Sequence, residues 1–221
     1  MPQSKTLEFI RRSVADMQIN WNENQALLRG TAAEAPVYSH TNHGMEYEAF
    51  PLMVRRLSGA EDRVNVIASR ALLQQHPVQA GQEVEIEGEV RSFNNKSGRG
   101  SRLVITLYAR QLRDGVGEHC NELVLAGAIC KPPVFRRTPM GREICDLLLA
   151  VNRRYGRADY LPCIAWGALA RRCAELSVGD AIRLEGRFQS RTYTKVEQGE
   201  TTQRIAYEIS VMQLEPAETA E

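Results

Sequence analysis

Lysine is scarce in this chain of 221 residues, since only Lys5, Lys96, Lys131 and Lys195 occur against 24 arginines. Net charge is equally small, because 28 basic residues face 27 acidic ones. The total charge therefore does not indicate a polyanionic ligand, and any such ligand must be argued from local placement. The arginine bias has two explanations that the sequence leaves open: Arg is the better planar donor to phosphate, and a GC-rich genome also favours it.

Long apolar runs are absent as well. The longest uncharged apolar stretches have the length of strands, which excludes a transmembrane helix. No basic, then apolar, then small-residue leader opens the chain, so a secretory signal is not expected. With 43% hydrophobic and 25% charged residues the composition is typical of soluble proteins. We expect a cytoplasmic, nucleoid-associated protein that makes no membrane contact.

Metal-binding and catalytic motifs are missing too. The five cysteines show no C-x-x-C spacing, and apolar neighbours favour buried, reduced thiols: Cys120, Cys130, Cys145, Cys163 and Cys173. His40 and His43 resemble half a metal site, but no second pair follows, so we interpret them as solvated. No nucleophile elbow, Walker loop or H-E-x-x-H occurs. Asp62 and Asp159 suit turn chemistry. We predict no enzyme, cofactor, metal site or small-molecule substrate.

One sequence unit occurs twice. Residues 24–30 (NQALLRG) match residues 121–127 (NELVLAG) at an offset of 97 residues. The offset holds at later landmarks, and one inserted residue then aligns Ser92 with Ser190. A period of this length is a complete small domain rather than a solenoid repeat. We predict homologous domains at 24–113 and 120–215, a linker at 114–119, an N-terminal extension at 1–23 and a tail at 216–221.

Each copy predicts strands with one short helix. In the second copy the strands are expected at 123–129, 144–151, 160–166, 182–191 and 204–214, with a helix at 168–176 and a polar loop at 197–203. The first copy gives the same order, with its helix at 71–75. This order is that of the oligonucleotide/oligosaccharide-binding (OB) barrel. The predicted fold is mainly β: two tandem five-stranded OB-fold barrels, each with a short helix between strands 3 and 4.

The N-terminal extension predicts one further helix. Leu7, Ile10, Val14 and Met17 fall on one helical face. Charges of both signs accompany them, so we expect this short amphipathic helix to pack on the barrels or on a partner subunit.

Basic and aromatic residues interleave in the second copy, where residues 120–215 hold 14 basic and 11 acidic residues. Cations that follow phosphates and flat rings that receive unstacked bases are typical of single-strand binding. The alternative, a core of aromatics with a solvated arginine face, stays open from this pattern alone. The candidate residues are Tyr155, Tyr160, Trp166 and Tyr193, with Arg136, Arg137, Arg153, Arg154, Arg187, Arg191 and Lys195.

The second copy resembles the bacterial single-stranded DNA-binding protein (SSB) family over nearly its whole length. The resemblance lies in N-x-L-V-L-A-G, K-P-P-x-x-R-x-T-P-x-G, A-V-N-R, D-Y-L-P-C-I-A-W-G, V-G-D-x-I-x-L-E-G-R and Q-S-R-x-Y, in that order. It implies that Tyr155, Tyr160, Trp166 and Tyr193 are stacking residues. It also implies binding of single-stranded DNA with little sequence preference, in DNA replication, recombination or repair, and a homodimer with four OB barrels.

The first copy departs from this pattern. Ser58, Arg63 and Ser69 occupy the positions that match Tyr155, Tyr160 and Trp166. Its basic residues persist, so we expect phosphate contacts and subunit packing with little stacking, and Phe93 lies near the fourth aromatic position. These basic residues are Arg55, Arg56, Arg63, Arg91, Lys96, Arg99 and Arg102. This degenerate copy motivates one alternative, a primosome-like accessory or adaptor protein whose barrels mainly contact proteins. A separate alternative is an RNA binder of cold-shock type, although nothing in the sequence reads a 2′-hydroxyl.

Overall fold

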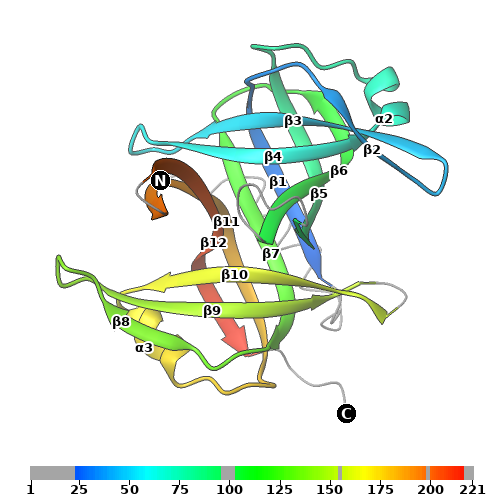
Figure 1. Cartoon of the computed structure of the whole chain (residues 1–221). Coiled ribbons are helices and arrows are strands. Elements are labelled where there is room, and N and C mark those ends of the chain that lie inside the picture. The colour runs from blue at the N-terminus through cyan, green and yellow to red at the C-terminus, as the bar shows by residue number, and fades with distance from the viewer. Residues whose placement is uncertain (1–22, 96–102, 154–155, 198–199, 217–221) are drawn as a thin grey trace.

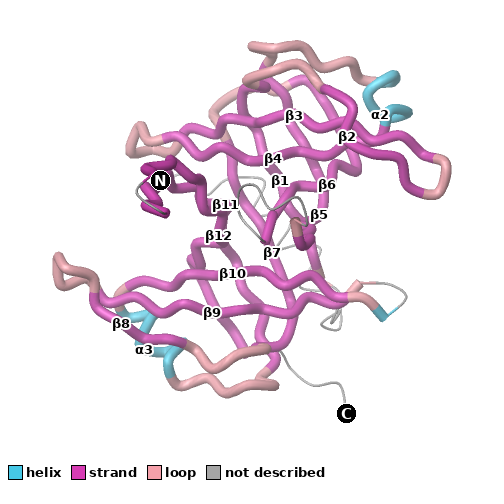
Figure 2. The backbone as a smooth tube through the Cα atoms, viewed as in Figure 1, coloured by secondary structure: helices cyan, strands magenta, loops and turns pink. Residues whose placement is uncertain are grey.

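The computed structural model describes residues 23–95, 103–153, 156–197 and 200–216, without the side chains of 195–197, 200, 202 and 204. Strands dominate this part of the chain (Figure 1), and two short helices lie at opposite ends of it (Figure 2). The mainly β class is confirmed. The expected N-terminal helix and the tail fall on residues 1–22 and 217–221, outside the described residues. None of the described helices is long and apolar enough to cross a membrane.

Barrel one occupies the first copy. Its elements are β1 (Asn24–Ala32), β2 (Val37–Asn42), β3 (Met45–Arg55), β4 (Glu61–Ser69), α2 (Arg70–Gln75), β5 (Glu83–Asn94) and β6 (Leu103–Asp114). The strands pair in the order β2-β3-β4-β6-β5-β1, and an added β3–β1 pairing closes the barrel. The predicted three strands, helix and two strands are confirmed, and β2 is a further edge strand.

Barrel two repeats this arrangement. Its elements are β7 (Cys120–Ile129), β8 (Val134–Arg137), β9 (Glu143–Asn152), β10 (Ala158–Trp166), α3 (Ala168–Ala174), β11 (Ala181–Glu197) and β12 (Glu200–Pro216). The polar loop expected at 197–203 is wrong: β11 and β12 keep pairing out to Glu197 and Glu200. Polar residues there continue the ladder because backbone hydrogen bonds, not apolar burial, hold a hairpin that projects from the barrel.

Alternation along the strands builds both cores. In β10, Leu161, Cys163 and Ala165 are buried, and the residues at 160 and 166 are exposed. Strands β4 and β5, and β9 from Cys145 onward, show the same period of two, which turns every second side chain inward. The same alternation that buries the core residues therefore also decides which side chains point to solvent.

Two repeated glycines let the barrels close. A Cβ atom on Gly30 would lie 2.3 Å from the carbonyl oxygen of Met53, and one on Gly127 would lie 2.4 Å from that of Ala150. Both glycines end the repeated motif at the place where the first strand crosses the second. The repeat thus preserves a close backbone approach that a side chain would block.

The two barrels share one continuous sheet. Strands β1 and β7 pair antiparallel from Asn24 opposite Leu125 to Arg29 opposite Cys120, so they lie side by side at the centre of Figure 1. The twelve strands consequently form a single pairing order that runs from β2 to β8. The first strand of each barrel thereby fixes the position of the other barrel.

Candidate nucleic-acid interface

The outward rings of barrel two lie on β10. Tyr160 is 50% exposed and Trp166 is 37% exposed, and both point away from the core because they alternate with buried residues. Trp166 ends the strand immediately before Gly167, whose φ of 58° turns the chain into α3. Two of the predicted stacking rings are therefore open to solvent on one face of one strand.

Tyr193 lies on the long β11–β12 hairpin and is half-buried. The guanidinium of Arg191 stands 5.7 Å from its ring centre, within the range of a cation–π contact. The fourth predicted ring, Tyr155, lies outside the described residues. We call Tyr160, Trp166 and Tyr193 the ring platform.

Several predicted phosphate contacts are exposed arginines in surface ion pairs. Arg136 contacts Asp146 at 2.6 Å and Arg137 contacts Glu143 at 3.1 Å, both along the β8–β9 hairpin. On the other hairpin, Arg191 lies 3.7 Å from Glu208. The exposed pair of Arg136 with Asp146 contributes only about 0–1 kcal/mol, so this guanidinium can turn to a phosphate at little cost. Glu143 is largely buried but keeps Arg171 when Arg137 turns away, whereas Glu208, 13% exposed, has a stronger hold on Arg191.

Of the remaining predicted contacts, some are exposed side chains and others lie outside the described residues. Arg55 is exposed and 3.6 Å from Glu61, and Phe93 is exposed at the end of β5. Arg154 and Lys96 fall outside the described residues, as does the side chain of Lys195.

Arg56 and Arg153 have a different environment from that expected. Each binds a fully buried aspartate through its Nε and a terminal nitrogen: Arg56 binds Asp62, with Nε 2.6 Å from Oδ2, and Arg153 binds Asp159. This bond raises the pKa of Arg56. The interpretation of both aspartates as turn residues is wrong, because they lie inside β4 and β10. Arg56 and Arg153 therefore bind the buried aspartates near the contact between the two barrels, and phosphate binding is not their first role.

The buried aspartates lock the barrels together reciprocally. Asp62 of barrel one accepts from the backbone N–H of Ser190 in barrel two, and the Ser190 hydroxyl accepts from the N–H of Arg63, both at 2.8 Å. Asp159 of barrel two accepts from the N–H of Ser92 at 2.5 Å, and the Ser92 hydroxyl accepts from the N–H of Tyr160 at 2.8 Å. We call this arrangement the Asp–Ser clamp.

The clamp positions one ring of the platform, Tyr160. Because the Tyr160 backbone is bound by a serine of the other barrel, the orientation of this exposed ring depends on the junction. The sequence held a signal for it: Asp62/Asp159 and Ser92/Ser190 are repeated at matching positions. Their pairing across the repeats, rather than within them, was not visible from spacing.

The two halves of the clamp differ in charge. Around Asp159, Arg91 adds a second contact at 3.2 Å and also pairs with Glu89. Around Asp62, Gln189 occupies the position that matches Arg91, and the nearby cation is Arg187, whose buried Nε has no hydrogen-bond partner among the described residues. Burial and repulsion from Arg56 lower the pKa of Arg187. Arg187 of barrel two therefore adds a second cation that shares Asp62 with Arg56.

A groove of about 1280 Å³ lies on barrel one and reaches barrel two. The β2–β3 hairpin, β5 and β6 line it, together with residues of the β9–β10 connection. We call it the junction groove. It contains rings and a cation of barrel one that the sequence comparison did not predict: His40, Tyr47, Tyr108 and Arg110, beside Arg91 and Phe93. Arg157 of barrel two also lines it.

The cysteines carry no reactive site. All five are free, with Cys145, Cys163 and Cys173 buried and Cys120 and Cys130 partly exposed. Burial raises the pKa of Cys120 and of Cys173 to about 12, which keeps both as thiols at neutral pH. The described residues contain no cluster of three or more metal-ligating side chains.

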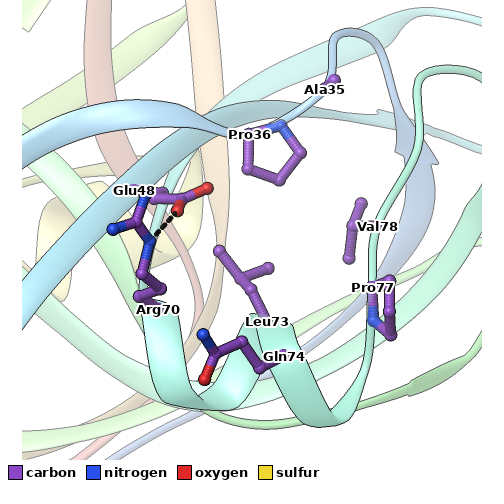
Figure 3. A pocket seen from close by; sticks show the side chains of 8 residues that line it. All are labelled: Ala35, Pro36, Glu48, Arg70, Leu73, Gln74, Pro77 and Val78. Carbon is purple, nitrogen blue, oxygen red and sulfur yellow. Dashed lines mark hydrogen bonds and ion pairs between the residues drawn. The ribbon is translucent and has the colours of Figure 1, made fainter.

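A small pocket of about 280 Å³ beside α2 differs in character (Figure 3). Pro36, Leu73 and Val78 give it apolar walls. Its one arginine, Arg70, is neutralised by Glu48 at 3.1 Å and by Glu46. The pocket therefore lacks the positive charge that a nucleic acid requires.

Comparisons with known proteins agree with this arrangement. Residues 120–216 match the model of the Single-strand binding protein family. "Single-stranded DNA-binding protein 2" of Chlorobaculum tepidum is 31% identical over 105 residues, which cover 43% of this chain and 69% of that protein. "Single-stranded DNA-binding protein A" of Bacillus subtilis is 35% identical over 80 residues, 33% of this chain and 46% of that protein.

The chain spans about half the length of the Listeria innocua and Bacillus relatives that it matches. Among solved structures, the wild-type single-stranded DNA binding protein from Thermus aquaticus matches with a TM-score of 0.73 at 22% identity, over 90% of this chain and 94% of that one. This likeness supports the tandem OB fold over the 90% of the chain that it covers. From the family match and the Chlorobaculum relative, the chain belongs to the single-strand binding protein family.

Proposed function

We propose that the protein binds single-stranded DNA with little sequence preference and protects it during replication, recombination or repair. One observation carries the proposal: Tyr160 and Trp166 are open to solvent on the same face of β10. A ring that projects from a barrel exposes apolar surface and adds no packing to the core. An unstacked base can cover that surface. The protein has no catalytic step to perform.

The expected binding energy follows from few contacts. Each base–aromatic stack contributes about 1–3 kcal/mol, and every base has a π-face, so stacking does not select sequence. The exposed arginines Arg136, Arg137 and Arg191 supply phosphate contacts around the rings. Two or three stacks plus these contacts reach about micromolar affinity. Binding should weaken as salt rises, because phosphate contacts release counterions.

Tryptophan fluorescence tests the proposal directly. The chain has two tryptophans, so a Trp21→Phe variant reports on Trp166 alone. We expect oligo(dT) to quench its emission, and Tyr160→Ala to weaken binding about tenfold. Met212→Ala is the matched control, because Met212 is another exposed apolar side chain of barrel two, 62% exposed on β12, and is not part of the ring platform. Unchanged Trp166 emission at saturating oligo(dT) would contradict the proposal and favour an adaptor that binds proteins.

We also propose that two chains form a homodimer, which brings four barrels together, and that it acts in the cytoplasm on the nucleoid. Family membership and the two barrels in each chain support this assembly. Light scattering on the purified chain should give twice the mass of one chain without DNA, and this mass plus that of the bound strand when DNA is added. A monomer at micromolar concentration would contradict it.

A further inference from the structure

The junction groove has the chemistry of a second strand-binding surface. His40 stacks on Tyr47 with ring centres 5.0 Å apart and planes 13° from parallel, and Tyr47 contacts Tyr108 at 5.8 Å. Tyr47 is only 4% exposed, so it supports the two rings above it. His40 is exposed and Tyr108 is half-buried. Three strands of barrel one thus contribute to one layered ring cluster on its outer face.

A cation covers this cluster. The guanidinium of Arg110 lies 4.7 Å from the Tyr108 ring centre, and Glu89 holds it at 2.9 Å. A guanidinium plane on a ring presents a flat, charged surface on which a base can stack and to which a phosphate can bind. Phe93, 47% exposed, adds an open ring to the same groove.

The charge of the groove is positive. Arg91, Arg110, Arg153 and Arg157 line it against a single lining acid, Glu89. Asp159 lies beneath Arg91 and Arg153 and is fully buried. The four arginines outnumber the two acids, Glu89 and Asp159. The surface of the groove is therefore complementary to a polyanion and not to a cation.

We propose that the junction groove binds a stretch of single-stranded DNA, which continues onto barrel two. Bases stack on Phe93, His40 and the Arg110 plane, and Arg157 carries the phosphate backbone across the junction. This inference rests on the proposed function and deepens it: barrel one stacks bases as well, through residues other than Ser58, Arg63 and Ser69, which occupy the positions of the barrel-two rings.

Affinity for strands of two lengths tests the groove. The groove variant is His40→Ala/Arg110→Ala, and the control is Arg113→Ala, which lies on the same strand with 53% exposure against 52% for Arg110 and also pairs with glutamates. Oligo(dT) of about 10 nucleotides fits one OB barrel, and about 30 nucleotides exceeds it. We expect the groove variant to bind the long strand about tenfold more weakly than the control does, and the short strand equally.

The outcomes separate this proposal from the proposed function. A groove variant that binds the long strand like Arg113→Ala overturns the groove, while quenching of Trp166 still supports the function. Loss of both signals in the wild-type protein overturns the function. Should the variant unfold, oligonucleotides with 5-iododeoxyuridine decide with the wild-type protein: crosslinks to His40, Phe93 or Tyr108 support the groove, and crosslinks confined to barrel two overturn it.

Discussion

The two barrels carry their rings on different strands of equivalent sheets. In barrel one, Tyr47 of β3 lies opposite Ser69 of β4, whereas the matching pair in barrel two is Ile144 of β9 and Trp166 of β10. The large ring has therefore changed strands within one cross-strand pair, whose members lie close enough to share a volume. A comparison of the repeats position by position therefore reports that barrel one has lost an aromatic residue at Ser69. The outer face of barrel one has nevertheless kept a ring, on the neighbouring strand.

A second cross-strand pair extends this comparison. Tyr108 lies opposite Ile67 in barrel one, and Ser210 lies opposite Ile164 in barrel two. Barrel one therefore layers several rings, whereas barrel two has a serine in place of Tyr108 and leaves Trp166 open to solvent. The same scaffold supports a layered cluster and an open ring because the register fixes which positions face outward and not which residue fills them.

The charges at the junction differ in the same way. Glu89 and Arg187 occupy matching positions of β5 and β11, one residue before Val90 and Phe188. Glu89 neutralises Arg91 in one half of the Asp–Ser clamp, and Arg187 adds a cation in the other. Among the described contacts, Asp62 is thus the one acid that interacts with Arg56 and Arg187. This half of the clamp should therefore be the more sensitive one to loss of its aspartate.

Removal of each clamp aspartate gives the largest expected effect. Breaking a buried ion pair by deleting one partner costs about 3–5 kcal/mol, since the remaining charge stays buried. Asp62→Ala should cost more than Asp159→Ala, because Arg91 keeps Glu89 whereas Arg56 and Arg187 then repel each other. The free energy of unfolding from urea denaturation measures both.

Asp146→Ala provides the control for this pair of variants. The Asp146 carboxylate binds Arg136, and both side chains are partly exposed to solvent. The free energy of unfolding should therefore fall by less than about 1 kcal/mol. Equal costs for Asp62→Ala and Asp146→Ala would show that the clamp contributes no more than a surface contact. Equal costs for the two clamp aspartates would remove the asymmetry between the barrels.

The fold was largely predictable from the sequence. Period-two alternation and the repeated glycines set the strands, and Gly179 after the apolar stretch indicated the end of α3. The edge strands β2 and β8 were missed because their residues are exposed on both faces, so they carry no alternation to detect. The length of the β11–β12 hairpin was missed for a related reason: its outer part is polar.

The site was predictable only in part. Tyr160 and Trp166 were found because the family resemblance marks their positions, and the structure leaves both rings exposed. The layered cluster of Tyr47 and Tyr108 was not found, since its members are 61 residues apart and meet only through the strand order. The role of Arg153 at the junction depends on a contact between the repeats, which no spacing within one copy encodes.

The helix starts of the two barrels allow the smallest test of their difference. Ser69 begins α2 with an extended backbone and accepts a hydrogen bond from the Leu72 N–H at 3.2 Å, whereas Gly167 begins α3 at a φ of 58° without a side-chain bond. Ser69→Gly should cost only a few tenths of a kcal/mol, because glycine is a tolerated N-cap. Gly167→Ser should cost about 1–3 kcal/mol, since its backbone conformation is nearly confined to glycine, although no atom lies within 4 Å of the added Cβ. Thermal unfolding of the two variants ranks them, and a larger loss for Ser69→Gly would mean that the hydrogen bond at Ser69, rather than the turn at Gly167, limits the stability of the helix starts.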